Sequence, residues 1–193
     1  MYHAPSFNAT FWAFLFKIDQ DLAESTHRRA CPCGGRLHRA DYPRKPRGGA
    51  DTLPDTYKSR FSFTCDRDGC RKRSTPPSVR FLGRRIYLGA FVVLISAMRH
   101  GPTPQRVRDI SALLDVDWRT IARWQVFWRD HFPQSHFWRA EGARVILLTT
   151  VATLPLLLLT AFLGRWDDCD DHNGWGRLLR FLAPITTAAA PPS

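Results

Sequence analysis

Four of the five cysteines in this 193-residue chain form two close pairs, Cys31-Pro-Cys33 and Cys65-Asp-Arg-Asp-Gly-Cys70. Two tight turns that each carry two thiols, and that each adjoin a strand-like stretch, are typical of a zinc ribbon. Zn²⁺ prefers four such sulfurs in a closed tetrahedron. The sequence therefore predicts a structural zinc site whose ligands are Cys31, Cys33, Cys65 and Cys70.

The spacing of the cysteines leaves alternatives open. One residue separates the first pair and four residues separate the second, whereas two to four are usual, so His27 and His38 remain substitute ligands. Gly34, Gly35 and Gly69 supply the backbone freedom that lets N–H groups point at the sulfurs. Four buried thiols without a metal are the other interpretation. A catalytic zinc is disfavoured because four thiolates leave no open coordination position.

The basic residues gather in the same part of the chain as the cysteine pairs. Residues 27–85 hold 16 Lys and Arg against 5 Asp and Glu, a charge of +11 that equals the charge of the whole chain. Such a block beside clustered cysteines indicates a polyanionic partner, most often nucleic acid. A solvated basic surface is the alternative. Arg71, Lys72 and Arg73, which follow the second pair, are candidate DNA-binding residues.

Periodicity predicts the elements around the cysteines. Residues 8–26 predict an amphipathic helix with Asn8 or Thr10 as its cap. Its apolar face comprises Phe11, Phe14, Leu15, Ile18 and Leu22. Residues 36–42 and 57–65 predict short strands joined by a loop over 43–55. Further helices are expected over 86–100, 104–116 and 117–132.

Residues 107–126 fit the pattern of a helix-turn-helix. The five positions that should be apolar hold Ile110, Leu114, Val116, Ile121 and Trp124. Ser111 is the small residue where two helices approach, Asp115 tolerates the turn, and Asp117 caps the second helix. An ordinary helical hairpin is the alternative.

In a helix-turn-helix the start of the second helix enters the major groove of DNA. This placement leaves Trp118, Arg119, Ala122 and Arg123 on the exposed face, with Thr120 near the helix start. Arg119 and Arg123 are candidates for guanine edges or phosphates, and Thr120 suits a phosphate oxygen. We expect the aromatic run that follows to form core rather than a base-stacking platform: Trp124, Phe127, Trp128, Phe132, Phe137 and Trp138.

The order CPCGG, CDRDGC and SALLDVDWRTIARWQVFWR resembles the N-terminal DNA-binding half of bacterial insertion-sequence transposases, over about residues 28–130. The resemblance implies a zinc ribbon and a helix-turn-helix that bind terminal repeats. It also implies that the four paired cysteines hold the metal and that Arg119, Thr120 and Arg123 contact the groove.

The cutting half of such transposases is a ribonuclease-H-like core in which two Asp and a Glu bind Mg²⁺. This chain has only two glutamates, Glu24 and Glu141, and 53 residues after position 140. We therefore expect no enzymatic activity, and a separate transposase or recombinase is a candidate partner.

Residues 145–163 contain no charged side chain. One interpretation is a membrane span, which needs about 20 apolar residues, with the basic part in the cytoplasm. The favoured one is a buried extended segment followed by a short helix over 154–163, because Thr149, Thr150 and Pro155 suit a break. Beyond it, the acidic residues at 167, 168, 170 and 171 beside His172 predict a solvated turn rather than a calcium loop, and a short helix near the end.

Together these features predict an α+β, mostly helical chain: a helix in 1–26, a basic zinc ribbon in 27–86, a helix-turn-helix region in 87–140, and an apolar segment with a tail in 141–193. The first residues lack the basic start and cleavage site of a signal peptide, so a cytoplasmic protein is expected. We expect a zinc-stabilised protein that binds double-stranded DNA. A membrane-anchored basic protein and an RNA-binding ribbon protein are the alternatives.

Overall fold

The computed structural model describes residues 8–44, 53–81, 103–114, 116–148, 154–163 and 172–187. This part of the chain is mixed α+β and mostly helical, with a small antiparallel sheet, as the sequence predicts. Several predictions fall outside the described residues: the helix over 86–100, most of the loop over 43–55, Asp115 in the turn, and the acidic residues of 167–171.

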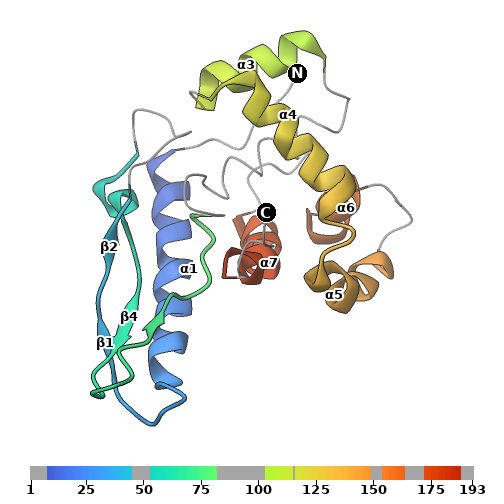
Figure 1. The fold of residues 1–193 in the computed structure, drawn as a ribbon. Helices are drawn as coiled ribbons and strands as arrows, with labels where there is room; N and C mark the ends of the chain where they lie inside the picture. The colour runs from blue at the N-terminus through green and yellow to red at the C-terminus, as the bar shows by residue number, and fades with distance from the viewer. Residues whose placement is uncertain are drawn as a thin grey trace.

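Helix α1 (Ala9–Arg28) runs beside the strands in Figure 1. Asn8 begins it, because its side-chain Oδ1 accepts a hydrogen bond of 2.9 Å from the Phe11 N–H and so satisfies one of the free donors of the first turn. The predicted helix and cap are therefore confirmed, with an end two residues later. Phe11, Leu15 and Ile18 recur every three or four residues and are buried.

The strands form two small antiparallel sheets. The first has the order β1 (Leu37–Arg39), β4 (Phe63–Cys65) and β5 (Arg73–Ser74), and the second pairs β2 (Tyr42–Pro43) with β3 (Ser59–Arg60). Each predicted strand is thus interrupted. The Asp41 carboxylate accepts the Ser62 N–H at 3.1 Å, which takes that donor out of the strand pairing. A 3₁₀ helix, η1 (Asp55–Lys58), occupies the start of the second predicted strand.

The remaining described helices follow in chain order: α3 (Pro104–Leu114), α4 (Trp118–Val126), the π-helical η2 (Phe127–His131), α5 (His136–Ile146), α6 (Leu156–Leu163), α7 (His172–Leu182) and η3 (Ala183–Thr186). Figure 1 shows α7 between α1 and the pair α5 and α6, with α3 and α4 beyond one end of α1. The uncharged segment is divided, since α5 ends at Ile146 and α6 begins at Leu156. The predicted short helix is confirmed, but the predicted buried extended start is wrong where it is described, because α5 continues into it and Leu147 and Leu148 are exposed. Among the described helices, none has the length and apolar character that crossing a bilayer requires.

Two hydrophobic clusters meet along α1. The larger contains Phe11, Trp12, Leu15 and Ile18 together with buried faces of α4, η2, α6 and α7. The smaller lies against the second half of α1 and includes Ala23, Leu37, Phe61, Phe63, Cys31 and Cys65. The predicted aromatic core is confirmed: Trp124, Trp128 and Phe132 are buried, and Phe127, Phe137 and Trp138 pack against them.

A buried ion pair joins α1 to the segment that follows the sheet. Arg80 Nε donates to Asp19 Oδ2 at 2.7 Å, and both side chains are almost fully buried. Asp19 also accepts from the Ser78 hydroxyl and the Val79 N–H, each at 2.6 Å. The Arg80 guanidinium in addition donates to the Thr56 carbonyl at 2.5 Å. This pair joins the segment after the sheet to α1, and removal of either charge would leave the other buried and unpaired. No sequence pattern predicted it.

Candidate metal centre

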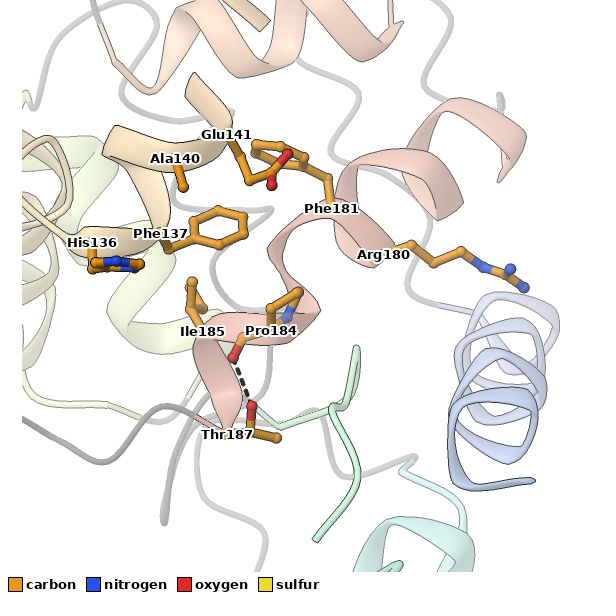
Figure 2. Close-up of a pocket in the computed structure, with 9 residues that line it drawn as sticks. All are labelled: His136, Phe137, Ala140, Glu141, Arg180, Phe181, Pro184, Ile185 and Thr187. Atoms are coloured by element: carbon orange, nitrogen blue, oxygen red, sulfur yellow. Dashed lines mark hydrogen bonds between the residues drawn. The ribbon is translucent and has the colours of Figure 1, made fainter. Parts of the chain in front are cut away.

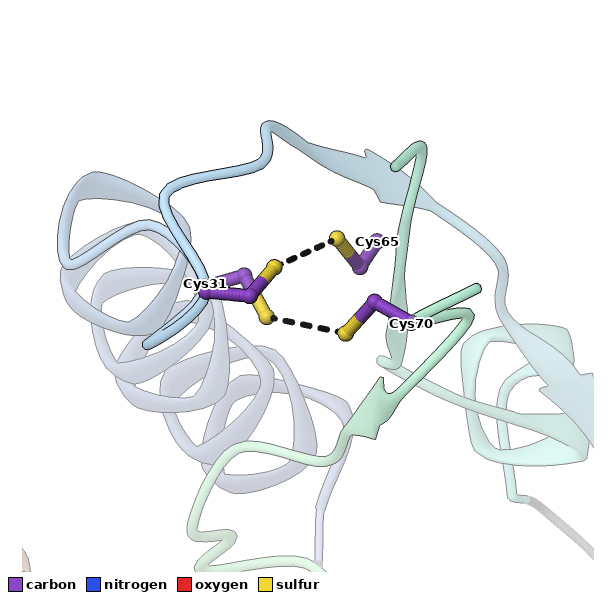
Figure 3. Close-up of side chains that lie close together, drawn as sticks. Cys31, Cys65 and Cys70 are labelled. Atoms are coloured by element: carbon purple, nitrogen blue, oxygen red, sulfur yellow. Dashed lines mark hydrogen bonds between the residues drawn. The ribbon is translucent and has the colours of Figure 1, made fainter. Parts of the chain in front are cut away.

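The structure brings the four predicted ligands together at the end of α1, in two turns that precede β1 and follow β4 (Figure 3). Their Sγ atoms all lie within 4.8 Å of one another, with Cys31 to Cys70 at 3.7 Å and Cys33 to Cys65 at 3.4 Å. All four are free thiols. A tetrahedral site with metal–sulfur bonds of about 2.3 Å has sulfurs about 3.8 Å apart. These separations are close to that value, so the four thiols could hold one metal ion.

The first turn closes immediately after α1. The Gly34 N–H donates to the Cys31 carbonyl at 2.8 Å, and the Cys31 N–H donates to the Gly35 carbonyl at 3.2 Å. Gly34 has a φ of +83°, where a side chain is disfavoured. Gly35 is required for a different reason: a Cβ there would lie 2.5 Å from Cys65 Sγ. The predicted backbone freedom thus holds for Gly34, whereas Gly35 provides room for the opposite turn.

The second turn is built in the same way. The Cys70 N–H donates to the Arg67 carbonyl at 3.1 Å, and Gly69 has a φ of +79°. Hydrogen bonds also link the two turns, because the Asp66 N–H donates to the Arg36 carbonyl at 3.0 Å and the Arg36 N–H donates to Asp66 Oδ1 at 2.9 Å. The backbone therefore holds the turns together before any metal contributes.

Each turn directs one backbone N–H at a sulfur. The Gly35 N–H lies 3.4 Å from Cys33 Sγ, and the Arg67 N–H lies 3.4 Å from Cys65 Sγ. The first contact, followed by those of neighbouring thiols, lowers the pKa of Cys33 to about 6. At Cys65 the Arg67 N–H lowers the pKa, but burial and the neighbouring thiols outweigh it and raise the pKa to about 12.

These opposite shifts show that a metal-free cluster accommodates one thiolate readily and resists further ionisation. A bound cation would favour ionisation of all four thiols, since a thiol that coordinates a metal is deprotonated. The arrangement therefore suits a cation that four thiolates surround.

Neither substitute ligand belongs to the cluster. His38 is exposed, and its Nε2 lies 3.2 Å from Asp66 Oδ2. The His27 Nε2 donates to the Leu37 carbonyl at 2.8 Å, and its ring stacks on Phe63. Within the described ranges, the group of ligand atoms close enough to hold one ion comprises only the four cysteines.

Two consecutive helices occupy the positions predicted for the helix-turn-helix. Asp117 begins α4, as predicted, because its Oδ1 accepts the Arg119 N–H at 2.8 Å. Ile121 and Trp124 are buried, and the Ser111 hydroxyl donates to the Val116 carbonyl across the connection. The side chains of Ile110 and Leu114 lie outside the described part. The helices and the cap are confirmed, while the identification as a DNA-binding motif stays a prediction.

The candidate contact residues lie together at the start of α4. Trp118 is 58% exposed, and the Arg119 guanidinium lies 5.6 Å from the centroid of its ring. Arg123 is exposed and donates to the Arg119 carbonyl at 3.3 Å and to the Thr120 hydroxyl at 3.4 Å. Thr120 and Ala122 are half-buried. The prediction of an exposed Ala122 is therefore wrong, because the second helix turns that side chain partly inward.

The basic residues of the cysteine region differ in whether they form ion pairs or hydrogen bonds within the protein. Arg71 forms an ion pair with Asp68 at 2.9 Å, and Arg73 donates to the Ala40 carbonyl at 3.3 Å. Lys72 is exposed and forms no ion pair with any described residue. The same holds for Arg29 and Arg36, which flank the first turn and were not among the predicted DNA-binding residues.

A groove of about 550 Å³ lies between α5 and the α7–η3 segment (Figure 2). Phe137, Phe181 and Ile185 provide apolar lining. The charged groups beside it are engaged, since Glu141 pairs with Arg144 at 3.3 Å and Arg180 pairs with Asp21 at 3.3 Å. We assign this groove no reaction.

Comparisons with known proteins found no match, whether to a family model, to a curated protein or to a solved structure. The likeness to insertion-sequence transposases therefore depends on the cysteine turns and the helix-turn-helix pattern alone.

Proposed function

We propose that the protein is a zinc-stabilised DNA-binding protein, a transposase-like accessory, remnant or regulator. The observation that carries the proposal is the position of exposed cations around the four-thiol cluster. Arg29, Arg36 and Lys72 have no ion-pair partner among the described residues, so these cations are available to the phosphates of a polyanion.

Zinc is the metal that this ligand set favours. Four thiolates in a tetrahedron are typical of Zn²⁺ or an iron–sulfur centre, and sulfurs about 3.8 Å apart correspond to a single ion of zinc's size. A three-stranded antiparallel sheet adjoins both cysteine turns, which supports the assignment of a zinc ribbon. In this proposal the metal holds the basic turns in one rigid arrangement.

The zinc assignment is tested by metal analysis of the purified protein, with about one zinc per chain expected. The variant Cys65→Ser should lose the zinc and should make residues 27–85 more susceptible to proteolysis, because bound zinc contributes to the stability of the folded region. Cys169→Ser is the matched control, since it removes the one cysteine outside the two pairs. A folded protein that contains no metal, or one that contains iron, would contradict the assignment.

Duplex DNA is the polyanion that the two surfaces together fit best. The cysteine region supplies cations for phosphates, which contribute affinity without sequence preference. The start of α4 presents Arg119 and Arg123 for base edges, where a bidentate contact discriminates by about 1–3 kcal/mol. The ribbon therefore provides most of the affinity and α4 the sequence preference.

The DNA assignment is tested by fluorescence anisotropy with labelled duplex DNA at several salt concentrations. The plot of log K against log salt has a negative slope, and each lost phosphate contact makes it less steep by about 0.9. The double variant Arg36→Ala/Lys72→Ala should therefore reduce its steepness by about 1.8. Arg139→Ala, an exposed arginine on α5, should leave the slope unchanged. Tighter binding of single-stranded RNA than of duplex DNA, or no binding of either, would overturn the proposal.

A further inference from the structure

The two surfaces assigned to DNA lie at opposite ends of α1. The four-thiol cluster follows the C-terminal end of this helix, because Cys31 is three residues beyond Arg28. Figure 1 shows α3 and α4 beyond the other end. Consistent with this, α4 shares the larger hydrophobic cluster with Phe11 and Leu15 of α1, whereas the cysteines share the smaller cluster with Ala23.

Helix α1 sets the distance between these surfaces. It has 20 residues, and a rise of 1.5 Å per residue gives a length of about 30 Å. The exposed cations near the cysteines and helix α4 are therefore separated by roughly the length of α1, about 30 Å.

The cysteine region is attached to α1 at three points along the helix. Near the start of the helix, the Tyr57 hydroxyl donates to the Trp12 carbonyl at 3.2 Å and the two rings meet edge to face. In the middle, Asp19 forms its buried pair with Arg80. Near the end, His27 bonds to the first strand. These three attachments hold the cysteine region against α1, and the larger hydrophobic cluster, which contains residues of both α1 and α4, holds α4 near the start of the helix.

From this geometry we infer that the DNA site is bipartite, with α4 and the cysteine turns contacting one duplex at two places about one helical turn apart. The inference rests on the proposed function and specifies its substrate. At 3.4 Å per base pair, a separation of about 30 Å corresponds to about nine base pairs. One helical turn of DNA is about 34–36 Å, so the two places lie on the same face of the duplex.

The inference predicts how affinity depends on the length of the DNA. A duplex of about eight base pairs reaches only one surface at a time, whereas one of about 16 base pairs or more reaches both. Joining two contacts on one ligand raises affinity by about 100-fold or more. Anisotropy titrations with duplexes of about 8 to 24 base pairs should therefore show a steep rise between these lengths, beyond the gradual gain from additional binding registers.

Footprinting with hydroxyl radicals on a long duplex locates the contacts. Two protected patches about one turn apart are expected. Arg36→Ala/Lys72→Ala should remove one patch and Arg119→Ala/Arg123→Ala the other, while Arg139→Ala keeps both. Zinc content and circular dichroism confirm that each variant is folded.

The outcomes separate this inference from the proposed function. Binding of duplex DNA with a single protected patch and no steep dependence on length would overturn the bipartite site and leave DNA binding intact. Absence of any binding to duplex DNA would overturn both. A steep rise together with two patches that respond separately to the two double variants would establish the bipartite site.

Discussion

The substitution Gly35→Ala tests whether the two cysteine turns are matched to each other. Its Cβ would lie 2.5 Å from Cys65 Sγ and 2.9 Å from the Arg67 Cβ. Cys65 is fully buried, so its sulfur has no free space to enter. The new methyl group must therefore push the two turns apart and move Cys65 away from the other three sulfurs.

The size of the effect follows from the required movement. An ordinary contact needs about 3.4 Å or more, so the turns must separate by nearly an ångström. Such overpacking costs about 1–3 kcal/mol. If the cost falls on the metal-bound state, the metal dissociation constant rises by about fivefold to 150-fold.

Cobalt serves as the probe, because its visible absorption reports both the affinity and the tetrahedral geometry of the site. Cobalt titrations of the metal-free protein should show weaker binding and a shifted spectrum for Gly35→Ala. Gly34→Asn is the matched control: a Cβ at Gly34 meets nothing within 4 Å, and Asn tolerates its positive φ. It should bind cobalt as the parent protein does.

Equal cobalt affinity and identical spectra for the parent and Gly35→Ala would refute the argument. That result would mean that the turns do not approach as closely as the structure has them, or that the cysteines do not bind the ion together. Zinc content measured on the same samples distinguishes these two explanations: bound zinc would favour the first, and absence of zinc the second.

Three further predictions concern the buried ion pair, the α4 cap and the Cys33 thiol. Asp19→Asn should lower the free energy of unfolding by about 3 kcal/mol, because the Arg80 charge stays buried without its partner; Asp21→Asn, which removes only exposed ion pairs, should cost less than about 1 kcal/mol in the same denaturant titration. Asp117→Ala should cost about 1 kcal/mol through loss of the α4 cap, measured by thermal denaturation, and an unchanged midpoint would contradict the cap. In the metal-free protein, the pKa of Cys33 is lowered from 9.0 to about 6, so its ultraviolet thiolate signal should appear near pH 6 and vanish in Cys33→Ser. Because the lowered pKa stabilises the fold fully only above about pH 9 and not at all below about pH 6, denaturant midpoints of the metal-free protein should fall as the pH is lowered through this window.

Much of the candidate site was predictable because its signals are local. Two close cysteine pairs with glycines in their turns predicted the four cysteines that cluster, although their spacing left His27 and His38 open as alternatives. The caps Asn8 and Asp117 mark the starts of α1 and α4, since a cap acts on backbone groups two or three residues away. Apolar spacing likewise identified the buried face of α1.

The interruptions of the strands could not be predicted, because they depend on a partner from another segment. Asp41 accepts a hydrogen bond from Ser62, which is 21 residues away. Strand propensity is evaluated along one segment and gives no information about which carboxylate competes for its donors.

The sequence by itself predicted the four cysteines that cluster, the main helix and the concentration of positive charge in residues 27–85. Only the tertiary structure decided which of those charges are free, since Arg71 has a carboxylate partner and Lys72 has none among the described residues. It also decided that Asp19 and Arg80, 61 positions apart, are buried together, and that the cysteines and α4 lie at opposite ends of α1. Periodicity and capping act within one turn of backbone, whereas burial pairs residues from distant segments, and that pairing exists only in the folded chain.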